Sequence, residues 1–429
     1  MTVRFITVLL ATVLLTACSS PKIVKQETVL SPLESALTLD RNWQVKLKGL
    51  PNKDAEGLFF SQDDERVFIA LTTGHLTAFK KDNTSRWTDQ VIWTTQFSEG
   101  ILSGPTRVDD RLIVGTDKGN VMALSADDGH IIWQTELSSE VLSLPVIAER
   151  KIFTRTVDGR LYALDLASGK IIWTFEHQIP SLSLRGAPAV VYEDGKLFVG
   201  WESGMVQAFT AKSGDLLWEA RVAVPKGRTD LERVVDVQSS LVFTQGRLFV
   251  MGFHGKLASI NPENGNFYFI KELSGYRDFV ADDSALYVVD DEDVIQAFDL
   301  GSGVSLWKQA ALKNRTVGDL VFFNDLLLAT DDWGYVHFIN KVQGTEYARV
   351  KHSNEYGDGN YILRVFVQDN RLYLLDEEGV ITSYQVRPST LAQFKAELAQ
   401  QEQASKEHAS QNKTAIEAGL NTQGKTVNE

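Results

Sequence analysis

The sequence has little of what several common protein classes need. It holds one Cys, seven His and ten Pro in 429 residues. One Cys cannot form an internal disulfide, a Cys-x-x-Cys redox pair or a cysteine-based zinc site. The 43 Lys and Arg stand against 56 Asp and Glu, a net charge of −13, and this excludes the dense basic surface that nucleic-acid binding requires. With 43% hydrophobic residues, the chain nevertheless has enough apolar surface to fold.

Motifs for catalysis and metal binding are also missing. The His residues are scattered, and the sequence contains no HExxH, CxxC or GxSxG motif. A Ser-His-Asp triad stays open, because its members need not be neighbours in the sequence. We therefore predict no metal, no cofactor and no catalytic residue.

Long hydrophobic runs are limited to residues 5–15, which are too few to span a bilayer and are typical of the apolar part of a signal peptide. The run ends in Leu15-Thr16-Ala17-Cys18, which resembles the bacterial lipobox. That resemblance implies removal of residues 1–17 and acylation of Cys18, with palmitate among the chains, and Ser19 implies sorting to the outer membrane. The alternative is a cleaved secretory signal with an incidental Cys. Residues 18–39 are polar and are predicted to be a flexible tether.

The dominant feature of the remaining chain is an internal repeat. A strand pattern, Gly-x-apolar-x-small-apolar, occurs eight times with a mean spacing of about 44 residues, in the range of propeller blades. A second β-rich segment precedes each copy, and a turn followed by a further strand comes after every copy except the last. The copies begin at Gly74, Gly119, Gly159, Gly204, Gly255, Asp293, Gly334 and Gly379.

Four copies carry a Trp ten residues after the small residue. Since a small residue leaves room for an indole, we expect the two positions to be neighbours on adjacent strands. One copy inverts the sizes, with Phe338 followed by Ala348, as close packing at a shared contact predicts. The other pairs are Ala123 and Trp133, Ala163 and Trp173, Ala208 and Trp218, Ser259 and Phe269, and Ala297 and Trp307.

The strand count predicts how the repeat array closes. One Trp-bearing strand, around Trp43, precedes the first Gly-led strand, and none follows the last. Pairing this N-terminal strand with the last blade would give a closed ring without an unpaired edge. We therefore predict an all-β fold, an eight-bladed β-propeller of four-stranded antiparallel blades over residues 40–387. Residues 388–429 are predicted to be a polar, partly helical or disordered tail.

The turn and Trp pattern, small-x-Asp-x-x-Ser-Gly-x-x-x-Trp, resembles the PQQ-like repeat of quinoprotein-type propellers. Together with the lipobox and the eight blades, residues 15–386 resemble the propeller lipoproteins of the outer-membrane β-barrel assembly machine. The resemblance implies a non-enzymatic scaffold on the periplasmic side of the outer membrane. Its implied partners are the POTRA domains of the barrel-inserting subunit and the machine's other lipoproteins. The alternative from the same repeat is a quinone (PQQ)-dependent periplasmic oxidoreductase.

Two loops between blades are the candidate partner-binding sites. Residues 180–186, Pro-Ser-Leu-Ser-Leu-Arg-Gly, place two Leu and an Arg in a loop where they have no evident core to fill, which is typical of a protein-contact patch. A fold-back of the Leu pair over the blade is the alternative. The family resemblance implies Leu182, Leu184, Arg185 and Asp236 as contact residues. Gln238 stands where the family pattern leads us to expect a second acid.

The sequence indicates two further candidate binding surfaces. Asp290, Asp291, Asp331 and Asp332 lie in turns expected on the same face as these loops, and could form an acidic patch that steers a basic partner. The alternative is that they are ordinary turn residues. A binder of peptidoglycan or polysaccharide would need exposed aromatic residues on a loop face, and the Trp residues outside the repeat are Trp87, Trp201 and Trp333.

Overall fold

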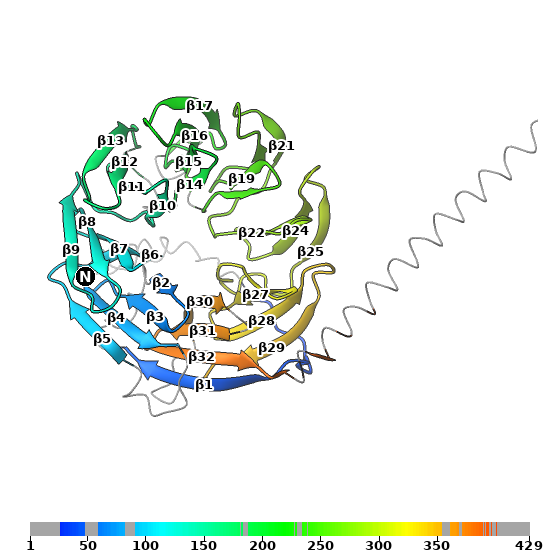
Figure 1. The fold of residues 1–429 in the computed structure, drawn as a ribbon. Coiled ribbons are helices and arrows are strands. Elements are labelled where there is room, and N and C mark those ends of the chain that lie inside the picture. Colours follow the sequence, from blue (N-terminus) through cyan, green and yellow to red (C-terminus); the bar gives the residue numbers. More distant parts are fainter. Residues whose placement is uncertain are drawn as a thin grey trace, which may run out of the picture.

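The ring architecture is seen in a computed structural model, which describes residues 26–47, 59–81, 91–180, 182, 188–226, 228–229, 234–237, 239–353, 361–368 and 371–388, and single positions up to residue 400. Eight four-stranded sheets stand around a common centre (Figure 1), and every strand pairing within them is antiparallel. The predicted eight-bladed propeller is confirmed.

Each of blades 1 to 7 runs from an inner to an outer strand in chain order. Blade 1 consists of β2 (Phe59–Gln62), β3 (Arg66–Ala70), β4 (His75–Lys80) and β5 (Val91–Gln96), and blade 2 of β6 (Ile101–Val108), β7 (Arg111–Thr116), β8 (Asn120–Ser125) and β9 (Ile131–Glu136). Blade 3 consists of β10 (Val146–Ala148), β11 (Lys151–Arg155), β12 (Arg160–Asp165) and β13 (Ile171–Glu176), and blade 4 of β14 (Val191–Glu193), β15 (Lys196–Gly200), β16 (Met205–Thr210) and β17 (Leu216–Arg221). Blades 5 to 7 are β18 (Val242–Thr244), β19 (Arg247–Met251), β20 (Leu257–Ile260), β21 (Phe267–Lys271); β22 (Val280–Ala281), β23 (Ala285–Val289), β24 (Ile295–Asp299), β25 (Ser305–Gln309); and β26 (Val321–Phe323), β27 (Leu326–Thr330), β28 (Tyr335–Asn340), β29 (Glu346–Lys351).

Blade 8 closes the ring with strands from both ends of the chain. Its strands are β30 (Ile362–Gln368), β31 (Arg371–Asp376), β32 (Val380–Val386) and β1 (Leu39–Lys46). The N-terminal strand β1 lies outside β32 (Figure 1) and places Trp43 opposite Ser383. The predicted closure is therefore confirmed.

Antiparallel order gives the ring two distinct faces. Turns between second and third strands, and the connections from one blade to the next, lie on one face, which we call the loop face. The hairpins between first and second strands and between third and fourth strands lie on the opposite face, which we call the hairpin face. The Gly-led pattern marks the third strand of every blade, so each of its leading residues lies at the loop face.

The hydrophobic core lies between blades rather than within them. Eight clusters of buried side chains occupy the eight interfaces between neighbouring blades, and each combines residues of two sheets. For example, Ile113 and Val121 of blade 2 pack with Ile152 and Tyr162 of blade 3. A blade is apolar on both sides for this reason, and the ring is a continuous packed structure.

The small residue and the Trp of each repeat face each other across the outer strand pair, as predicted. Ala163 is the direct partner of Trp173 on one side and of Phe153 on the other. The rings of Phe153 and Trp173 lie 6.0 Å apart, so they meet across the alanine methyl. The inverted pair, Phe338 and Ala348, occupies the same register positions in blade 7.

The Trp has a second contact that the sequence analysis did not foresee. A Cβ added to Gly169 in the outer hairpin of blade 3 would lie 2.4 Å from the Trp133 ring of blade 2. The Trp133 Nε1–H also donates a hydrogen bond to the Leu166 carbonyl of that hairpin, at 3.2 Å. Trp133 thus fastens its blade to the next one. The same bond links Trp93 to Ala126, Trp173 to Ala211, Trp218 to Pro262 and Trp307 to Lys341, at 2.9–3.2 Å.

This contact explains the copy that lacks an aromatic residue. Blade 7 carries Ala348 at the Trp position, and its neighbour is blade 8. The third and fourth strands of blade 8, β32 and β1, come from opposite ends of the chain, so no hairpin connects them. Without a hairpin Gly and carbonyl to contact, an indole in blade 7 would have no partner there.

Segments outside the ring differ from the prediction in one respect. Described positions between 388 and 400 are helical, which agrees with a partly helical tail. Residues 26–38, predicted as part of a flexible tether, instead lie against blades 6, 7 and 8 with several hydrogen bonds. Cys18 and the rest of the N-terminus lie outside the described residues.

Candidate functional site

The two candidate loops come together at a groove on the loop face. The connection from β13 to β14 contributes Ile179, Pro180 and Leu182, and the connection from β17 to β18 contributes Pro225 and Val235. The volume of the groove is about 310 Å³, and Glu202, Ser203 and Arg221 add polar groups to its walls. An apolar groove with a few charged groups suits a protein side chain or an extended peptide segment.

Leu182 is the predicted contact residue that this groove places at the surface. Its side chain is 46% exposed and lines the groove. An aliphatic side chain that is half exposed beside other apolar groups is available to a partner. Leu184, Arg185 and Gln238, also named from the sequence, lie outside the described residues.

A cluster of buried side chains around Arg155 lies beneath the groove. The Arg155 guanidinium is completely buried and donates to both carboxylate oxygens of Glu202 at 2.8 Å and to the Gly200 carbonyl at 2.7 Å. It also lies 4.3 Å from the centroid of the Trp201 ring. The ion pair, in which Arg155 Nη2 contacts both Glu202 oxygens, and the cation–π contact together hold this turn in place.

His177 extends the cluster to the start of the first loop. Its ring stacks on Trp201 with centroids 4.4 Å apart, and its Nε2 lies 2.9 Å from the Ser203 Oγ. Burial and the nearby Arg155 charge lower the pKa of His177, which favours the neutral imidazole. The sequence analysis missed this cluster, although a charged residue inside the apolar strand pattern at Arg155 was a visible signal.

The second loop is attached to the same turn through its backbone. The Val237 N–H donates to the Trp201 carbonyl at 3.3 Å, and the Phe253 N–H donates to the Asp236 carbonyl at 2.8 Å. A Cβ on Gly200 would lie 2.4 Å from Val237 Cγ1, so the glycine permits this approach. Asp236 itself is completely buried. The Asp236 side chain, expected from the sequence as a contact residue, is therefore not at the surface of the loop.

The acidic turns of blades 6 to 8 serve mainly to build the turns. The Asp290 carboxylate accepts the backbone N–H groups of Glu292 and Val294, and Asp331 accepts those of Trp333 and Tyr335. Side-chain acceptors of this kind stabilise tight turns. This is the ordinary role that the sequence left open as the alternative.

The predicted acidic patch is wrong for Asp331, which is only 1% exposed. Its carboxylate pairs with the Arg315 guanidinium at 2.6 Å and lies 3.3 Å from His337 Nε2. Two other acids in this sector also have cationic partners: Asp293 pairs with Arg277 at 3.3 Å and Glu292 with Lys313 at 2.9 Å. Asp290 and Asp291 are partly exposed and Asp332 is exposed. The surface charge is therefore smaller than the acidic runs suggest.

Of the aromatic residues considered for carbohydrate binding, the two that the structure describes do not form an exposed platform. Trp201 is completely buried in the cluster described above. Trp333 is 50% exposed, and its Nε1–H donates to Glu27 at 2.7 Å. Trp87 lies outside the described residues.

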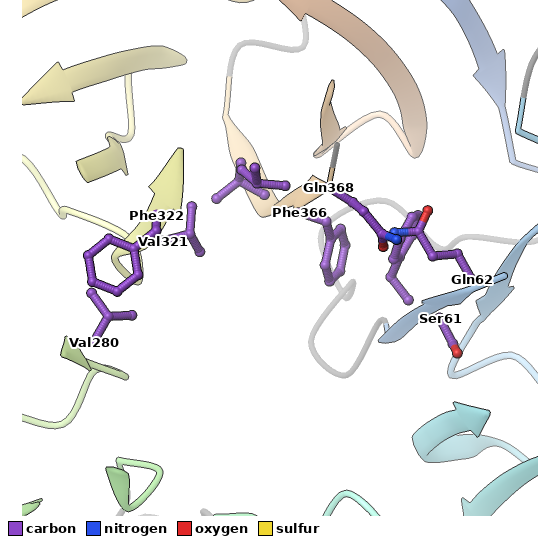
Figure 2. A pocket seen from close by; sticks show the side chains of 10 residues that line it. Ser61, Gln62, Val280, Val321, Phe322, Phe366 and Gln368 are labelled. Atoms are coloured by element: carbon purple, nitrogen blue, oxygen red, sulfur yellow. The ribbon is translucent and has the colours of Figure 1, made fainter. Parts of the chain in front are cut away.

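A second cavity, of about 450 Å³, lies at the centre of the ring. In Figure 2, Val280 and Phe322 lie on one side of this opening, and Phe366 and Gln62 on the other. The lining side chains are apolar, amide or hydroxyl groups and include no acid or base. They come from the inner strands of blades 1, 6, 7 and 8 and are Phe60, Ser61, Gln62, Val280, Val321, Phe322, Val365, Phe366, Val367 and Gln368.

Two kinds of site are absent from the part of the chain that the structure describes. No group of three His, Cys, Asp or Glu side chains there is arranged to hold a metal ion. Within the same residues, no helix has the length and hydrophobicity needed to cross a bilayer.

The fold and the indole contacts between blades define a class of protein, the eight-bladed propellers built from PQQ-like repeats. Residues 72–309, more than half of the chain, match the family model described as outer membrane protein assembly factor BamB. The chain belongs to the BamB family of outer membrane protein assembly factors.

Relatives and solved structures agree with this assignment. The BamB proteins of Escherichia coli K12 and Kangiella koreensis are 31% and 36% identical over 388 and 358 residues, covering 87% and 83% of this chain and 97% and 90% of theirs. The crystal structure of BamB from Moraxella catarrhalis superposes with a TM-score of 0.70 at 23% identity, over 81% of this chain and all of that one.

A quinone enzyme shares the fold. The quinohemoprotein alcohol dehydrogenase of Comamonas testosteroni has a TM-score of 0.60 at 10% identity, over 81% of this chain and 76% of that one. This likeness concerns the fold alone. Since the relatives of this chain are assembly factors, the prediction of a non-enzymatic protein is confirmed and the oxidoreductase alternative is not supported. Family membership indicates a role in outer-membrane protein assembly and a location at the outer membrane.

Proposed function

We propose that the chain is a scaffold that binds the periplasmic POTRA domains of the barrel-inserting subunit through the groove on its loop face. The observation that carries this proposal is the half-exposed Leu182 beside a groove of about 310 Å³ with apolar walls. Leu184 and Arg185, which follow in the same loop, complete the proposed contact. The scaffold does no chemistry; it holds mobile periplasmic domains in orientations that favour insertion of new barrels.

The buried cluster below the groove supports this role because a contact loop binds best when it is already in its bound arrangement. Arg155 and Glu202 are linked by two hydrogen bonds inside the protein, and Trp201 lies directly beside them. Asp236 is completely buried in the second loop, and its carbonyl accepts a hydrogen bond from the Phe253 N–H. We propose that these residues position the loops and do not touch the partner.

The test is a binding measurement with the purified periplasmic region of the barrel-inserting subunit. Leu182→Ala should weaken binding about 5- to 30-fold, as expected for an aliphatic anchor worth about 1–2 kcal/mol. The triple variant with Leu184→Ala and Arg185→Ala should abolish recovery in a pull-down. Leu306→Ala is the matched control, because this Leu is also exposed but lies on the outer strand of blade 6. Equal recovery of the wild type and the triple variant would refute the assigned contact.

We further propose that Cys18 carries the lipid that anchors the scaffold to the outer membrane, with the ring in the periplasm. Each buried CH₂ contributes about 0.8 kcal/mol, so two or three acyl chains on one residue anchor the protein stably. Mass spectrometry of the membrane-extracted protein should show an acylated Cys at the mature N-terminus, and Cys18→Ser should release the protein from membranes. A wild-type N-terminus without acyl chains would refute the anchor.

A further inference from the structure

The segment that leads into the propeller is bound to the loop face of blades 6 and 7. The Thr28 N–H and Oγ1 both donate to the Lys313 carbonyl, at 3.1 and 3.0 Å. In return, Arg315 Nη1 donates to the Thr28 carbonyl at 3.1 Å, and Asn314 Nδ2 donates to the Gln26 carbonyl at 2.9 Å. Four hydrogen bonds therefore join one short stretch to three consecutive residues of the connection between β25 and β26. We call residues 26–38 the strap.

Side-chain contacts continue along the strap. Glu27 accepts the indole N–H of Trp333 at 2.7 Å, and the Ser31 carbonyl accepts a hydrogen bond from Arg349 Nη1 at 3.1 Å. Leu30 packs against the cluster between blades 6 and 7, and Leu37, 2% exposed, is part of the cluster between blades 7 and 8. The strap is thus held by both hydrogen bonds and apolar burial.

The surface under the strap is itself fixed. Arg315 is held by the buried Asp331 carboxylate through its Nε and Nη2, at 2.8 and 2.6 Å, while its Nη1 is directed at the strap. An arginine held in this way presents its remaining donors in one direction. Asp331 is buried and cannot act as a surface charge. Its role is to hold Arg315 in place for the strap.

The strap crosses the full height of the ring. It begins at the loop face, because Lys313 lies in a connection between blades and Trp333 in a turn between second and third strands. It ends at Leu39, which pairs with Val386 at the hairpin-face end of β32. Without the strap, the chain would leave the ring at the hairpin face.

We propose that the strap turns the loop face toward the outer membrane. The loop face then lies next to a lipid surface, because the acyl chains on Cys18 insert into the membrane on this side of the ring. The inference rests on the lipid anchor of the proposed function and adds an orientation to it. Blades 6 and 7 then lie nearest the point of attachment, and the groove beside Leu182 faces the space next to the membrane where a membrane-embedded partner begins.

The orientation follows from the length of chain between the anchor and the strap. Seven residues, 19–25, lie between Cys18 and Gln26, where the strap begins, so eight Cα–Cα steps separate the two. They span at most about 29 Å when fully extended and about 15 Å on average as a flexible chain. The six residues of β28 span about 20 Å between the two faces. Turning the hairpin face to the membrane would therefore require this stretch to cover at least about 20 Å, which is more than its average length of about 15 Å, whereas the loop face is reached without stretching it.

The first test concerns the strap itself and needs no lipid. Hydrogen exchange of the full chain with Cys18→Ser should show protection within residues 26–31 at the Thr28 amide, which donates to the Lys313 carbonyl. Leu30→Asp places a carboxylate in the apolar cluster and should speed this exchange about tenfold or more. Val29→Asp is the matched control, since Val29 is 87% exposed and carries the same new charge one residue away. Equal exchange in the two variants, or no protection in the parent protein, would overturn the proposal.

The second test measures orientation on vesicles of outer-membrane phospholipids that carry an acceptor dye in their headgroups. Donor dyes are placed at Asp332→Cys on the loop face and Gln343→Cys on the hairpin face, which are exposed positions at the two ends of β28. Energy transfer should be stronger from the first site, and Leu30→Asp should remove the difference while Val29→Asp keeps it. Exchange protection of residues 26–31 in the labelled proteins confirms that the dyes leave the strap in place.

The outcomes separate this inference from the anchor on which it rests. A protein that lacks acyl chains by mass spectrometry refutes the anchor, while the exchange experiment still judges the strap. An acylated, membrane-bound protein with equal transfer from both dyes, or stronger transfer from the hairpin face, refutes the orientation alone.

Discussion

The contact between Trp133 and the hairpin of the next blade can be tested at a single methyl group. In Gly169→Ala the new Cβ would lie 2.4 Å from Trp133 Cε3, and the residue has a φ of +71°. Gly246→Ala is the matched control, because Gly246 has a φ of +66° but nothing within 4 Å of its added Cβ. Both variants have the backbone strain, and only Gly169→Ala displaces the indole.

The two costs can be separated. The left-handed conformation costs an alanine about 1–2 kcal/mol, partly offset by about 0.4–1 kcal/mol from the stiffer unfolded chain. Gly246→Ala should therefore lower the free energy of unfolding by about 1 kcal/mol. Gly169→Ala should add about 1 kcal/mol for the lost Trp133 hydrogen bond, 3.2 Å long in the native protein, and about 1–3 kcal/mol for overpacking. The expected total is about 3–5 kcal/mol.

The assay is urea unfolding followed by far-ultraviolet circular dichroism, with native-state hydrogen exchange to locate the loss. The double variant Trp133→Ala with Gly169→Ala completes a cycle. Without the indole, the cost of the alanine should fall toward the cost at position 246, with a remainder from Thr135 Oγ1, which would lie 2.7 Å from the new Cβ. Equal costs for the two single variants, or an undiminished cost in the Trp133→Ala background, would refute the contact between blades as the reason for this glycine.

Two further predictions follow from the same ring. Ala348→Trp should destabilise the protein, because the indole would meet Phe338 directly across the strand pair and find no hairpin in blade 8; a gain in the unfolding midpoint would contradict this. Burial disfavours the charged form of His337, but its contacts with Asp331 and Glu346 outweigh burial and raise its pKa above the ordinary 6.5. The stability from protonated His337 should thus be complete below pH 6.5 and be lost as the pH rises through the higher native pKa, and His337→Gln should remove this part of the pH dependence. An unchanged profile would show that this His does not titrate in that range.

Much of the fold could be predicted because the same local sequence pattern occurs eight times. The Gly-led strands, the register between Ala163 and Trp173, and the pairing of Trp43 with the last blade all follow from spacing alone. The size exchange at Phe338 and Ala348 was also readable, since it preserves a local contact. The cause of the size exchange could not be predicted, because it depends on which blade lacks a hairpin between its third and fourth strands.

The site was less predictable, because exposure depends on neighbours from other parts of the chain. Leu182 lies at the surface as expected, but Asp236 is buried and Asp331 is covered by Arg315 and His337. A run of acidic residues shows charge without showing what lies opposite. Arg315 and Asp331 are 16 residues apart in the sequence, and only the packing of the turns brings them together.

By itself, the sequence determined the kind of ring, the number of its blades and the way it closes, because strand period and turn chemistry are local and the repeat multiplies them. The tertiary structure decided which side chains reach the surface and which face carries the tether. Those depend on contacts between segments hundreds of residues apart, such as Thr28 with Arg315 and Ser31 with Arg349. No local pattern encodes such contacts, since each is set by where the closed ring places the two segments.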